Sequence, residues 1–393
     1  MTRRNPLASA YLDVNDGHLI RVVLEAKQIT RADLVDLTGW ARSTVSRRVD
    51  ALVDLGLLTS PGEARSSGGR PPSLLRFNGD AGTILVADLG ISHSTVAVVN
   101  LLGDPFGEPV DVELDLSNGP GATLPRILDE LRRQRSLVAE APLAAVVGLP
   151  APIDAHTGRP THPPILAGWH DFPLGERVHE EFQVPVFVEK DANLMALGEQ
   201  RSTWPQARSL IFVKVGTGIG SGIVLDSELY RGAGGAAGDV GHIQLEEYES
   251  ALCRCGRHGC LEAVAGGAAL ATRMRALGRS AVRARDVGVL LHAGDPEAGA
   301  LVREAGELIG RVLASVVSFA NPEVIVLGGD LGVETLLLGA ARAEILRRPL
   351  ELATKDLHFV ASAQSTDSGI RGAAALSIDR LWPSRSPRPR HTS

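Results

Sequence analysis

One histidine and three cysteines have the types and the spacing of metal ligands. His242 is followed by Cys253, Cys255 and Cys260, which are the only cysteines among the 393 residues. Three thiolates and one imidazole complete the tetrahedral coordination that Zn²⁺ adopts in structural sites, with no position left open. A disulfide framework would require paired cysteines at wider spacing, whereas clustered thiols in a reducing compartment are typical of metal ligands. The sequence therefore predicts a structural Zn²⁺ site.

A second group of residues has the chemistry of DNA contact. Apolar side chains at 45, 49, 52 and 53 form one stripe of a predicted helix over residues 42–55. Arginine and hydroxyl side chains on the opposite face of such a helix can bind base edges and phosphates. The alternative is a solvated face, but this helix follows a Thr-Gly turn and precedes a predicted hairpin. The candidate DNA-contacting residues are Arg42, Ser43, Thr44, Arg47 and Arg48.

The segment after this helix supplies one further candidate. Residues 67–72 read SGGRPP, in which glycines allow close approach of the backbone and prolines keep it extended. We expect Arg70 to lie on a wing that enters a narrow minor groove. The alternative is a flexible linker that carries one incidental arginine.

Three helices and a β-hairpin must position these residues. The apolar periodicity predicts helices over 16–26, 30–39 and 42–55, and a strand at 73–77 returns after a loop. Thr30 and Asp33 have the spacing of a capping box. This order is typical of a winged helix-turn-helix DNA-binding domain, which we place at residues 1–78. Eleven Arg or Lys and eight Asp or Glu give this segment a net charge of +3, while the rest of the chain carries −9.

The remainder of the chain is an α/β protein that repeats one unit, a buried strand followed by a tight polar turn and a second strand. The first copy has strands at 83–89 and 95–100, and the second has a strand at 210–215 followed by GTGIGSG at 216–222. A third strand at 324–327 ends in two glycines. Predicted helices at 124–137, 192–199, 261–275 and 297–317 lie between the strands. Duplicated halves leave a cleft between them, where we expect ligands to bind.

Together these motifs resemble the ROK family (repressors, open reading frames and kinases), in its branch of regulators with an N-terminal winged helix. The similarity covers residues 15–376 and is carried by GTGIGSG at 216–222, GDVGH at 238–242, EKDAN at 189–193 and the cysteine loop ending in GCLE at 259–262. It implies an actin-like, two-lobed ATPase fold of the sugar-kinase type, and a homodimer or tetramer. We expect a first lobe at 79–200, a second lobe at 201–380 whose last helix returns to the first lobe, and a disordered tail at 381–393.

The same resemblance implies which residues bind a sugar. In members that phosphorylate sugars, the position of Asp191 is the general base that takes the proton of a sugar hydroxyl. The positions of Asp239, His242 and Glu262 contact sugar hydroxyls, and Lys190 stands where the kinases carry an asparagine. Carboxylates suit this task because they accept hydrogen bonds from neighbouring hydroxyls. Taken alone, Asp191 could instead cap the helix that follows it.

The phosphate-binding side departs from the kinase pattern. Kinases of the family carry D-x-G-G-T-[KN] in the first phosphate turn, and this chain has DLGISH at 88–93, so Ile91 replaces the second glycine. The neighbouring cation Lys190 should lower the basicity of Asp191, and Ile165 replaces an asparagine. The second turn is intact, so ATP is a doubtful ligand and catalytic transfer is not expected. The vestigial phosphate turns comprise Asp88, Gly90, Gly216, Thr217, Gly218 and Gly220.

These observations predict a sugar-responsive transcription regulator, a repressor of carbohydrate-metabolism genes that a small sugar releases from double-stranded operator DNA. An active ATP-dependent sugar kinase with an appended DNA-binding module is the alternative from another class, and a constitutive DNA binder with a vestigial cleft is a third. Apolar runs such as 314–320 are too short to span a membrane. No apolar segment follows the basic N-terminal residues, so we expect a cytoplasmic protein.

Overall fold

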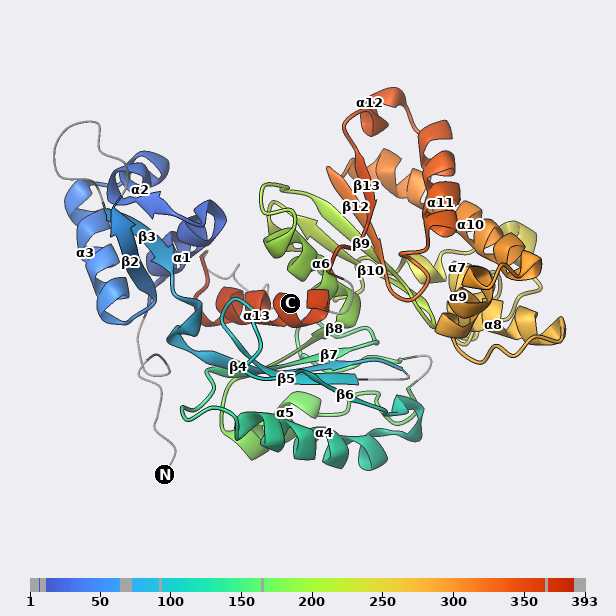
Figure 1. Ribbon diagram of the computed structural model, residues 1–393, viewed down its shortest axis with the longest axis horizontal. Helices are drawn as coiled ribbons and strands as arrows, with labels where there is room; N and C mark the ends of the chain where they lie inside the picture. Colours follow the sequence, from blue (N-terminus) through green and yellow to red (C-terminus); the bar gives the residue numbers. More distant parts are fainter. Residues whose placement is uncertain are drawn as a thin grey trace.

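The computed structural model describes Leu7 and residues 12–63, 73–91, 94–163, 166–364 and 367–384. Its N-terminal part contains three helices and a small antiparallel sheet of strand order β1-β3-β2 (Figure 1). The elements are α1 (Val14–Ala26), β1 (Ile29–Thr30), α2 (Arg31–Thr38), α3 (Arg42–Asp54), β2 (Leu58–Glu63) and β3 (Ser73–Phe77). The predicted winged helix-turn-helix is therefore present.

Local sequence sets the ends of these helices. The Asp13 side chain accepts backbone hydrogen bonds at the start of α1. Thr30 and Asp33 form the predicted capping box of α2. Gly39 ends α2 with a φ of 68°, a left-handed conformation that most side chains oppose, so the turn into α3 depends on this glycine.

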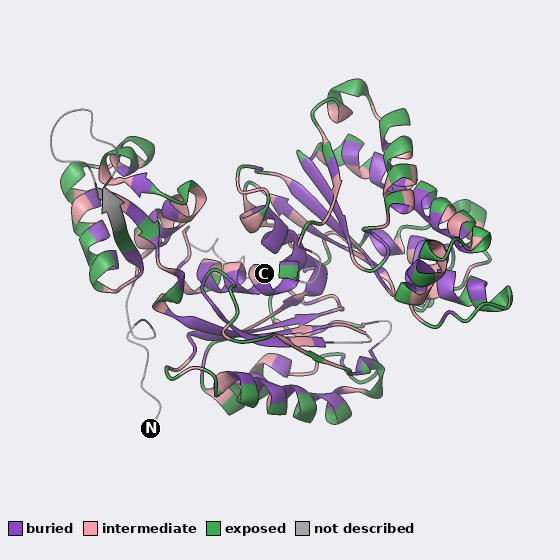
Figure 2. Ribbon diagram, viewed as in Figure 1, coloured by how far each residue is buried: buried purple, intermediate pink, exposed green. Residues whose placement is uncertain are grey.

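The apolar face of α3 is narrower than the sequence predicts. Val45, Val49 and Leu52 are fully buried, whereas Val53 is 37% exposed. Successive residues of a helix lie about 100° apart, so Val53 follows Leu52 round to the solvent side. Figure 2 shows the same alternation of buried and exposed positions along the helices of this domain.

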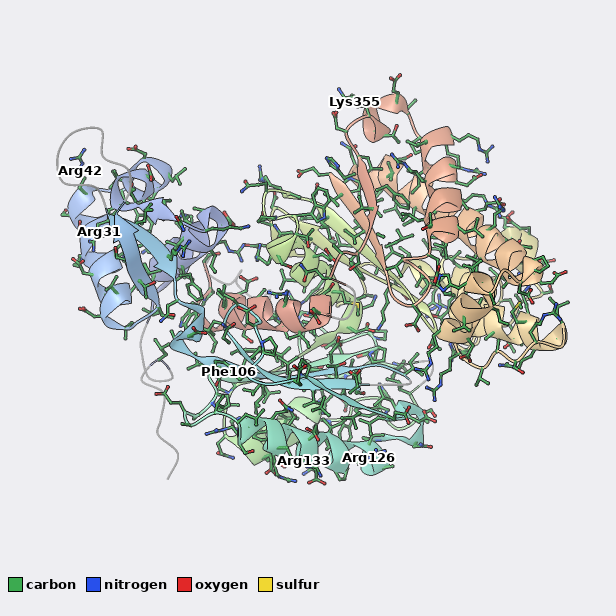
Figure 3. The ribbon with its side chains drawn as sticks, viewed as in Figure 1. Arg31, Arg42, Phe106, Arg126, Arg133 and Lys355 are labelled. Atoms are coloured by element: carbon green, nitrogen blue, oxygen red, sulfur yellow. The ribbon has the colours of Figure 1, made fainter. Side chains whose placement is uncertain are left out.

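The first lobe is built on a mixed sheet of strand order β6-β5-β4-β7-β8. β4 runs antiparallel to β5 and parallel to β7, and β7 runs parallel to β8. Helices α4 (Pro120–Arg135) and α5 (Leu174–Phe182) cover one face, and Arg126 and Arg133 of α4 lie on its outer side (Figure 3). The strands are β4 (Thr83–Leu89), β5 (Ser94–Asn100), β6 (Val110–Val112), β7 (Ala144–Leu149) and β8 (Val186–Lys190).

The second lobe repeats this plan in a sheet of strand order β11-β10-β9-β12-β13. Its first strand, β9, is again antiparallel to the strand that follows it, β10, and parallel to β12. The duplication predicted from the sequence is therefore present. The strands are β9 (Leu210–Val215), β10 (Ile219–Leu225), β11 (Glu228–Leu229), β12 (Val324–Gly328) and β13 (His358–Ala361).

The helices of the second lobe include one correction to the sequence prediction. The single helix expected over 261–275 is two helices, α7 (Leu261–Ala265) and α8 (Gly267–Ala276), which meet at Gly266. The backbone nitrogen of Gly267 donates to the carbonyl of Gly216, so the break brings α8 against the second phosphate turn. Two adjacent glycines favour such a break because glycine is a poor helix former. The other helices are α9 (Ala284–His292), α10 (Pro296–Ala320), α11 (Thr335–Arg347) and α12 (Glu351–Thr354).

Two helices join the lobes. α6 (Asp191–Ser202) packs on β9 and β10 of the second lobe, and α13 (Asp367–Leu381) packs on β4, β5 and β7 of the first. The two helices meet through glycines, because a β-carbon at Gly198 would lie 1.9 Å from the Ser368 carbonyl oxygen. One at Gly372 would lie 1.8 Å from the Leu194 carbonyl oxygen. Any larger residue at either position would push the two helices apart.

The start of the predicted disordered tail at 381 is wrong. Leu381 ends α13, and Trp382 is only 5% exposed. Gly17 of α1 lies against the carbonyl groups of Trp382 and Pro383, where a β-carbon would approach to 2.5 and 2.4 Å. Burial of the large indole outweighs the proline-rich composition that follows it. Residues 385–393 lie outside the described part of the chain, within which no helix is both long and apolar enough to cross a bilayer.

Candidate functional site

A cleft of about 230 Å³ lies between the two lobes. Its walls come from the ends of β4, β8, β9 and β10, from the start of α6 and from the 3-10 helix η4 (Val240–His242). The residues that the sequence assigns to sugar or phosphate binding all line this one cleft. They are Asp88, Gly90, Lys190, Asp191, Gly216, Thr217, Gly218, Gly220, Asp239, His242 and Glu262.

Asp191 is held by two donors at the start of α6. Its Oδ1 accepts a hydrogen bond from the backbone nitrogen of Ala192, and its Oδ2 lies 2.7 Å from Nζ of Lys214 on β9. Such a charge-assisted bond is stronger than a neutral one. Sequence reasoning missed Lys214, although a lone lysine in the otherwise apolar strand LIFVKV is the signal that could have found it.

Lys190 interacts electrostatically with Asp191, but the cation in contact with that carboxylate is Lys214. Its Nζ extends to the second lobe and donates to the carbonyl oxygen of Gly238 at 3.4 Å. Burial lowers the pKa of Lys190 against the opposing effect of nearby carboxylates. The cation that pairs with Asp191 is therefore Lys214, because the Lys190 side chain points toward Gly238 instead.

Asp88 lies at the first phosphate turn, where β4 ends. Burial raises the pKa of Asp88 to about 6, while Lys214 opposes this shift and Asp191 adds to it. Ile91 also lines the cleft, so a branched side chain stands where the kinase pattern has glycine. Ser92 and His93, the next two departures from that pattern, lie outside the described residues, as does Ile165.

Glu262 connects the sugar side of the cleft to the second phosphate turn. Its Oε2 accepts a hydrogen bond of 2.9 Å from the backbone nitrogen of Ile219. A β-carbon at Gly218 would lie 2.2 Å from the same oxygen, so a larger residue there would displace this carboxylate. Part of the hydrogen-bonding capacity of Glu262 is thus used to hold the turn, and its Oε1 lies 4.0 Å from Nη2 of Arg254.

The four predicted metal ligands come together in the second lobe. One ligand atom from each of His242, Cys253, Cys255 and Cys260 lies within 4.8 Å of the other three. The sulfur atoms of Cys255 and Cys260 are 3.7 Å apart, and Nδ1 of His242 is 3.7 Å from Sγ of Cys253. Tetrahedral zinc with Zn–S bonds of about 2.3 Å requires sulfur separations of about 3.8 Å. The donor set and its spacing therefore fit Zn²⁺.

The exposed face of α3 carries most of the predicted DNA-contacting residues. Arg42, Ser43 and Arg47 are exposed and Thr44 is half-buried. Figure 3 shows Arg42 at the outer edge of the domain, away from the two lobes. Arg70 lies outside the described residues.

Arg48 is not on this face, which corrects its prediction as a DNA contact. Its guanidinium pairs with Asp13 at 2.9 Å and with Asp16 at 2.6 Å, both at the start of α1. It also lies 5.9 Å from the ring centre of Trp40. Arg48 therefore joins α3 to α1 within the domain.

Arg21 of α1 ties the DNA-binding domain to both lobes. Its Nη2 lies 2.5 Å from Oδ1 of Asp379 on α13, and its Nη1 donates to the carbonyl oxygen of Ser227 at 3.2 Å. Ser227 lies in the turn between β10 and β11 of the second lobe. Arg201 of α6 contacts the same two groups, at 2.9 Å from the Ser227 oxygen and 3.3 Å from Asp379. A cavity of about 360 Å³ adjoins this junction, and no local sequence pattern predicts it.

Comparisons with known proteins agree with this architecture. A model of the ROK family matches residues 120–380, and one of the IclR helix-turn-helix domain matches residues 18–62. The xylose repressor of Caldicellulosiruptor bescii is 29% identical over 346 residues, which cover 82% of this chain and 86% of that protein. The glucokinase of Halalkalibacterium halodurans is 31% identical over 249 residues, or 58% of this chain and 75% of that enzyme.

A solved structure extends the likeness of fold to nearly the whole chain. A ROK family transcriptional regulator, described as a homologue of the E. coli MLC protein, superposes with a TM-score of 0.77 at 23% identity. The alignment covers 94% of this chain and 98% of that one. Because the family match spans well over half of the residues, the protein belongs to the ROK family and joins a helix-turn-helix DNA-binding domain to a sugar-kinase-like domain.

Proposed function

We propose that this protein is a sugar-responsive transcriptional repressor that binds operator DNA through α3 and releases it when a sugar occupies the interlobe cleft. The observation that carries the proposal is the junction at Arg21, where one side chain of the DNA-binding domain bonds to both Asp379 and Ser227. A sugar that favours one arrangement of the lobes shifts the position of this junction. The similarity to a xylose repressor supports the same conclusion.

The cleft has the chemistry that a polyhydroxylated ligand requires. Asp191, Asp239 and Glu262 offer carboxylate oxygens that accept hydrogen bonds from hydroxyl groups. His242 lines the cleft as well, and its Nδ1 faces the cysteines, so Nε2 is left for a ligand. A neutral sugar would thus find several acceptors and one imidazole in a single pocket.

We further propose that the four-ligand cluster holds a structural Zn²⁺. The ion would tie the cysteine loop to η4, which ends at His242 on the cleft wall. Its contribution is to fix the position of this wall, since three thiolates and one imidazole leave no coordination site for a reaction.

Each chain supplies one recognition helix, so reading an operator of two half-sites requires two copies of the chain. Helix-turn-helix dimers place two recognition helices in successive major grooves about 34 Å apart. We therefore propose a homodimer, alone or within a tetramer, that reads two half-sites. A sugar that changes the spacing of the two α3 helices would weaken operator binding.

A sugar kinase is the second candidate, favoured by the intact second phosphate turn and the similarity to a glucokinase. Two features oppose it. The carboxylate of Asp191 is engaged by Lys214, and Ile91 stands in the first phosphate turn. A coupled assay with ATP and a panel of hexoses and pentoses should therefore detect no phosphorylation, and clear turnover would establish the kinase.

Operator binding in the presence of sugars tests the repressor directly. The promoter region of the chain's own gene is labelled, and binding is followed by fluorescence anisotropy while D-xylose, D-glucose or N-acetyl-D-glucosamine is added. We expect specific binding that one of these sugars weakens by about tenfold or more, in the range usual for allosteric coupling. Specific binding that no sugar alters, in a protein that no sugar stabilises against heat, would contradict the proposal.

A further inference from the structure

Three charged side chains meet where the two lobes approach each other. Lys214 comes from β9 of the second lobe, Asp88 from the end of β4 in the first lobe, and Asp191 from the start of the connecting helix α6. All three line the cleft. Nζ of Lys214 lies 2.7 Å from Asp191, whose side chain is only 7% exposed.

The sheet leaves room for the lysine side chain. Lys214 pairs with Gly220 on β10 and with Gly328 on β12, so neither neighbouring strand places a side chain beside it. Gly328 cannot be larger, because a β-carbon there would lie 2.4 Å from the ring of Phe212. The long stem of Lys214 can therefore extend between two glycines to the carboxylates.

Charge accounts for the position of this lysine. Burial disfavours the ammonium of Lys214, but Asp191 and Asp88 outweigh this effect and raise its pKa. Without a cation, simultaneous ionisation of these two buried and electrostatically interacting carboxylates is unfavourable. Further charged groups of the described residues that line the same cleft are Lys190 from β8, Asp330 after β12, Asp239 before η4 and Glu262 of α7.

We propose that Lys214 is a built-in counter-cation that holds the Asp191 carboxylate in place as a hydrogen-bond acceptor for the sugar and joins the second lobe electrostatically to Asp88 of the first. The role toward a sugar rests on the proposed function. The role between the lobes does not. With a cation of its own at this point, the cleft needs no metal or nucleotide to balance the two carboxylates. Lys214 is thus a positioning residue, and Asp191 is the group that touches the ligand.

Three variants separate charge from shape: Lys214→Met, Asp88→Asn and the double variant. Methionine keeps most of the volume of lysine without its charge, and the double variant restores the wild-type net charge of the cluster. Melting temperature is measured between about pH 5 and pH 8, with and without Mg²⁺, a cation that prefers carboxylate ligands. Affinity for D-xylose, D-glucose and N-acetyl-D-glucosamine is measured over the same range.

We expect Lys214→Met to melt about 5 °C or more below the wild type at pH 8 and to recover toward pH 5, because a proton then replaces the ammonium. Adding Asp88→Asn should restore most of the melting temperature at pH 8. Mg²⁺ should stabilise Lys214→Met and leave the wild type and the double variant unchanged. Affinity of Lys214→Met for the sugar that binds the wild type should fall about tenfold at pH 8 and should not recover at lower pH, because a proton does not restore the ion pair that holds Asp191.

A wild-type pH profile in Lys214→Met, or no rescue by Asp88→Asn, would show that Lys214 only fills space and would overturn the inference. Should Lys214→Met fail to fold, Lys214→Arg must fold with the wild-type profile, since it keeps the charge. If neither Lys214→Met nor Lys214→Arg folds, the inference is likewise overturned, because the shape of the lysine side chain and not its charge would then be what the fold requires. The melting measurements need no sugar, so a wild-type protein that binds none would refute the proposed function and leave this test standing.

Discussion

Arg21 of α1 donates a hydrogen bond of 3.2 Å to the carbonyl oxygen of Ser227, 206 positions further along the chain in the second lobe. The same guanidinium forms an ion pair with Asp379 on α13, the helix that packs on the first lobe. One side chain of the DNA-binding domain therefore senses the position of both lobes. Both contacts cannot persist unchanged if the lobes rotate relative to each other.

Substitution of Arg21 should uncouple the sugar from DNA binding. In Arg21→Gln, the sugar should still bind the cleft with wild-type affinity, because Arg21 lies outside that cleft. Its effect on operator affinity should shrink from about tenfold or more to less than about threefold. Titration calorimetry gives the sugar affinity, and anisotropy with and without sugar gives the coupling.

Arg177→Ala is the control, since within the described part of the chain Arg177 pairs only with its helical neighbour Glu180 on the surface of α5. It should leave both sugar affinity and coupling unchanged. Full coupling in Arg21→Gln would show that the signal reaches the DNA-binding domain by another route.

Substitution of the two neighbouring arginines of α3, Arg47 and Arg48, should have different effects, one on DNA affinity and the other on stability. Arg47 is exposed, so Arg47→Ala should weaken operator binding by about 1–3 kcal/mol without lowering the melting temperature. Arg48→Ala should instead lower the free energy of unfolding by about 1–2 kcal/mol, because Asp13 and Asp16 lose their cation. Anisotropy measures operator affinity and thermal denaturation measures stability for both variants. A loss of stability in Arg47→Ala, with a loss of operator affinity alone in Arg48→Ala, would contradict the prediction.

Spacing along the chain predicted the features whose residues are close in sequence. The metal ligands lie between His242 and Cys260, and the structure brings their atoms together as expected. The three DNA-binding helices follow from local periodicity and capping, including the box of Thr30 and Asp33. The cleft residues were predicted from family motifs, and all of them line one cavity.

Contacts between segments that are distant in the chain could not be predicted from the sequence. The local pattern of α3 predicts Arg48 as a DNA contact. Its partners, Asp13 and Asp16, lie at the start of α1, so that pattern cannot reveal them. The sequence presents Lys214 only as one residue of a buried strand, because its partner Asp191 lies 23 positions away and is brought beside it by the fold. No local pattern connects Arg21 with Ser227, since only the packing of α1 against the lobes brings them together.

Loss of one cysteine should remove the metal. Cys255→Ser leaves two thiolates and one imidazole, which bind Zn²⁺ far more weakly than four ligands. Metal analysis of the wild type should give about one zinc per chain, and Cys255→Ser should retain little. His258 lies exposed in the same loop but outside the cluster, so His258→Ala should keep its zinc. A folded wild-type protein without zinc would exclude the structural site.

Asp88 should make the protein less stable as the pH rises. Its pKa is about 6 in the folded protein against an ordinary value of 3.8, so the folded state binds the proton more tightly than the unfolded chain. This contribution to stability is complete below about pH 3.8 and is lost as the pH rises through about 6. Asp88→Asn should therefore exceed the wild type in stability by about 3 kcal/mol near pH 8, and this advantage should vanish near pH 4. Urea denaturation across this range measures the difference.

Asp356→Asn, at a side chain that is 88% exposed, is the control and should show no such pH-dependent gain. An equal gain for Asp88→Asn at both ends of the range would mean that charge burial is not its cause.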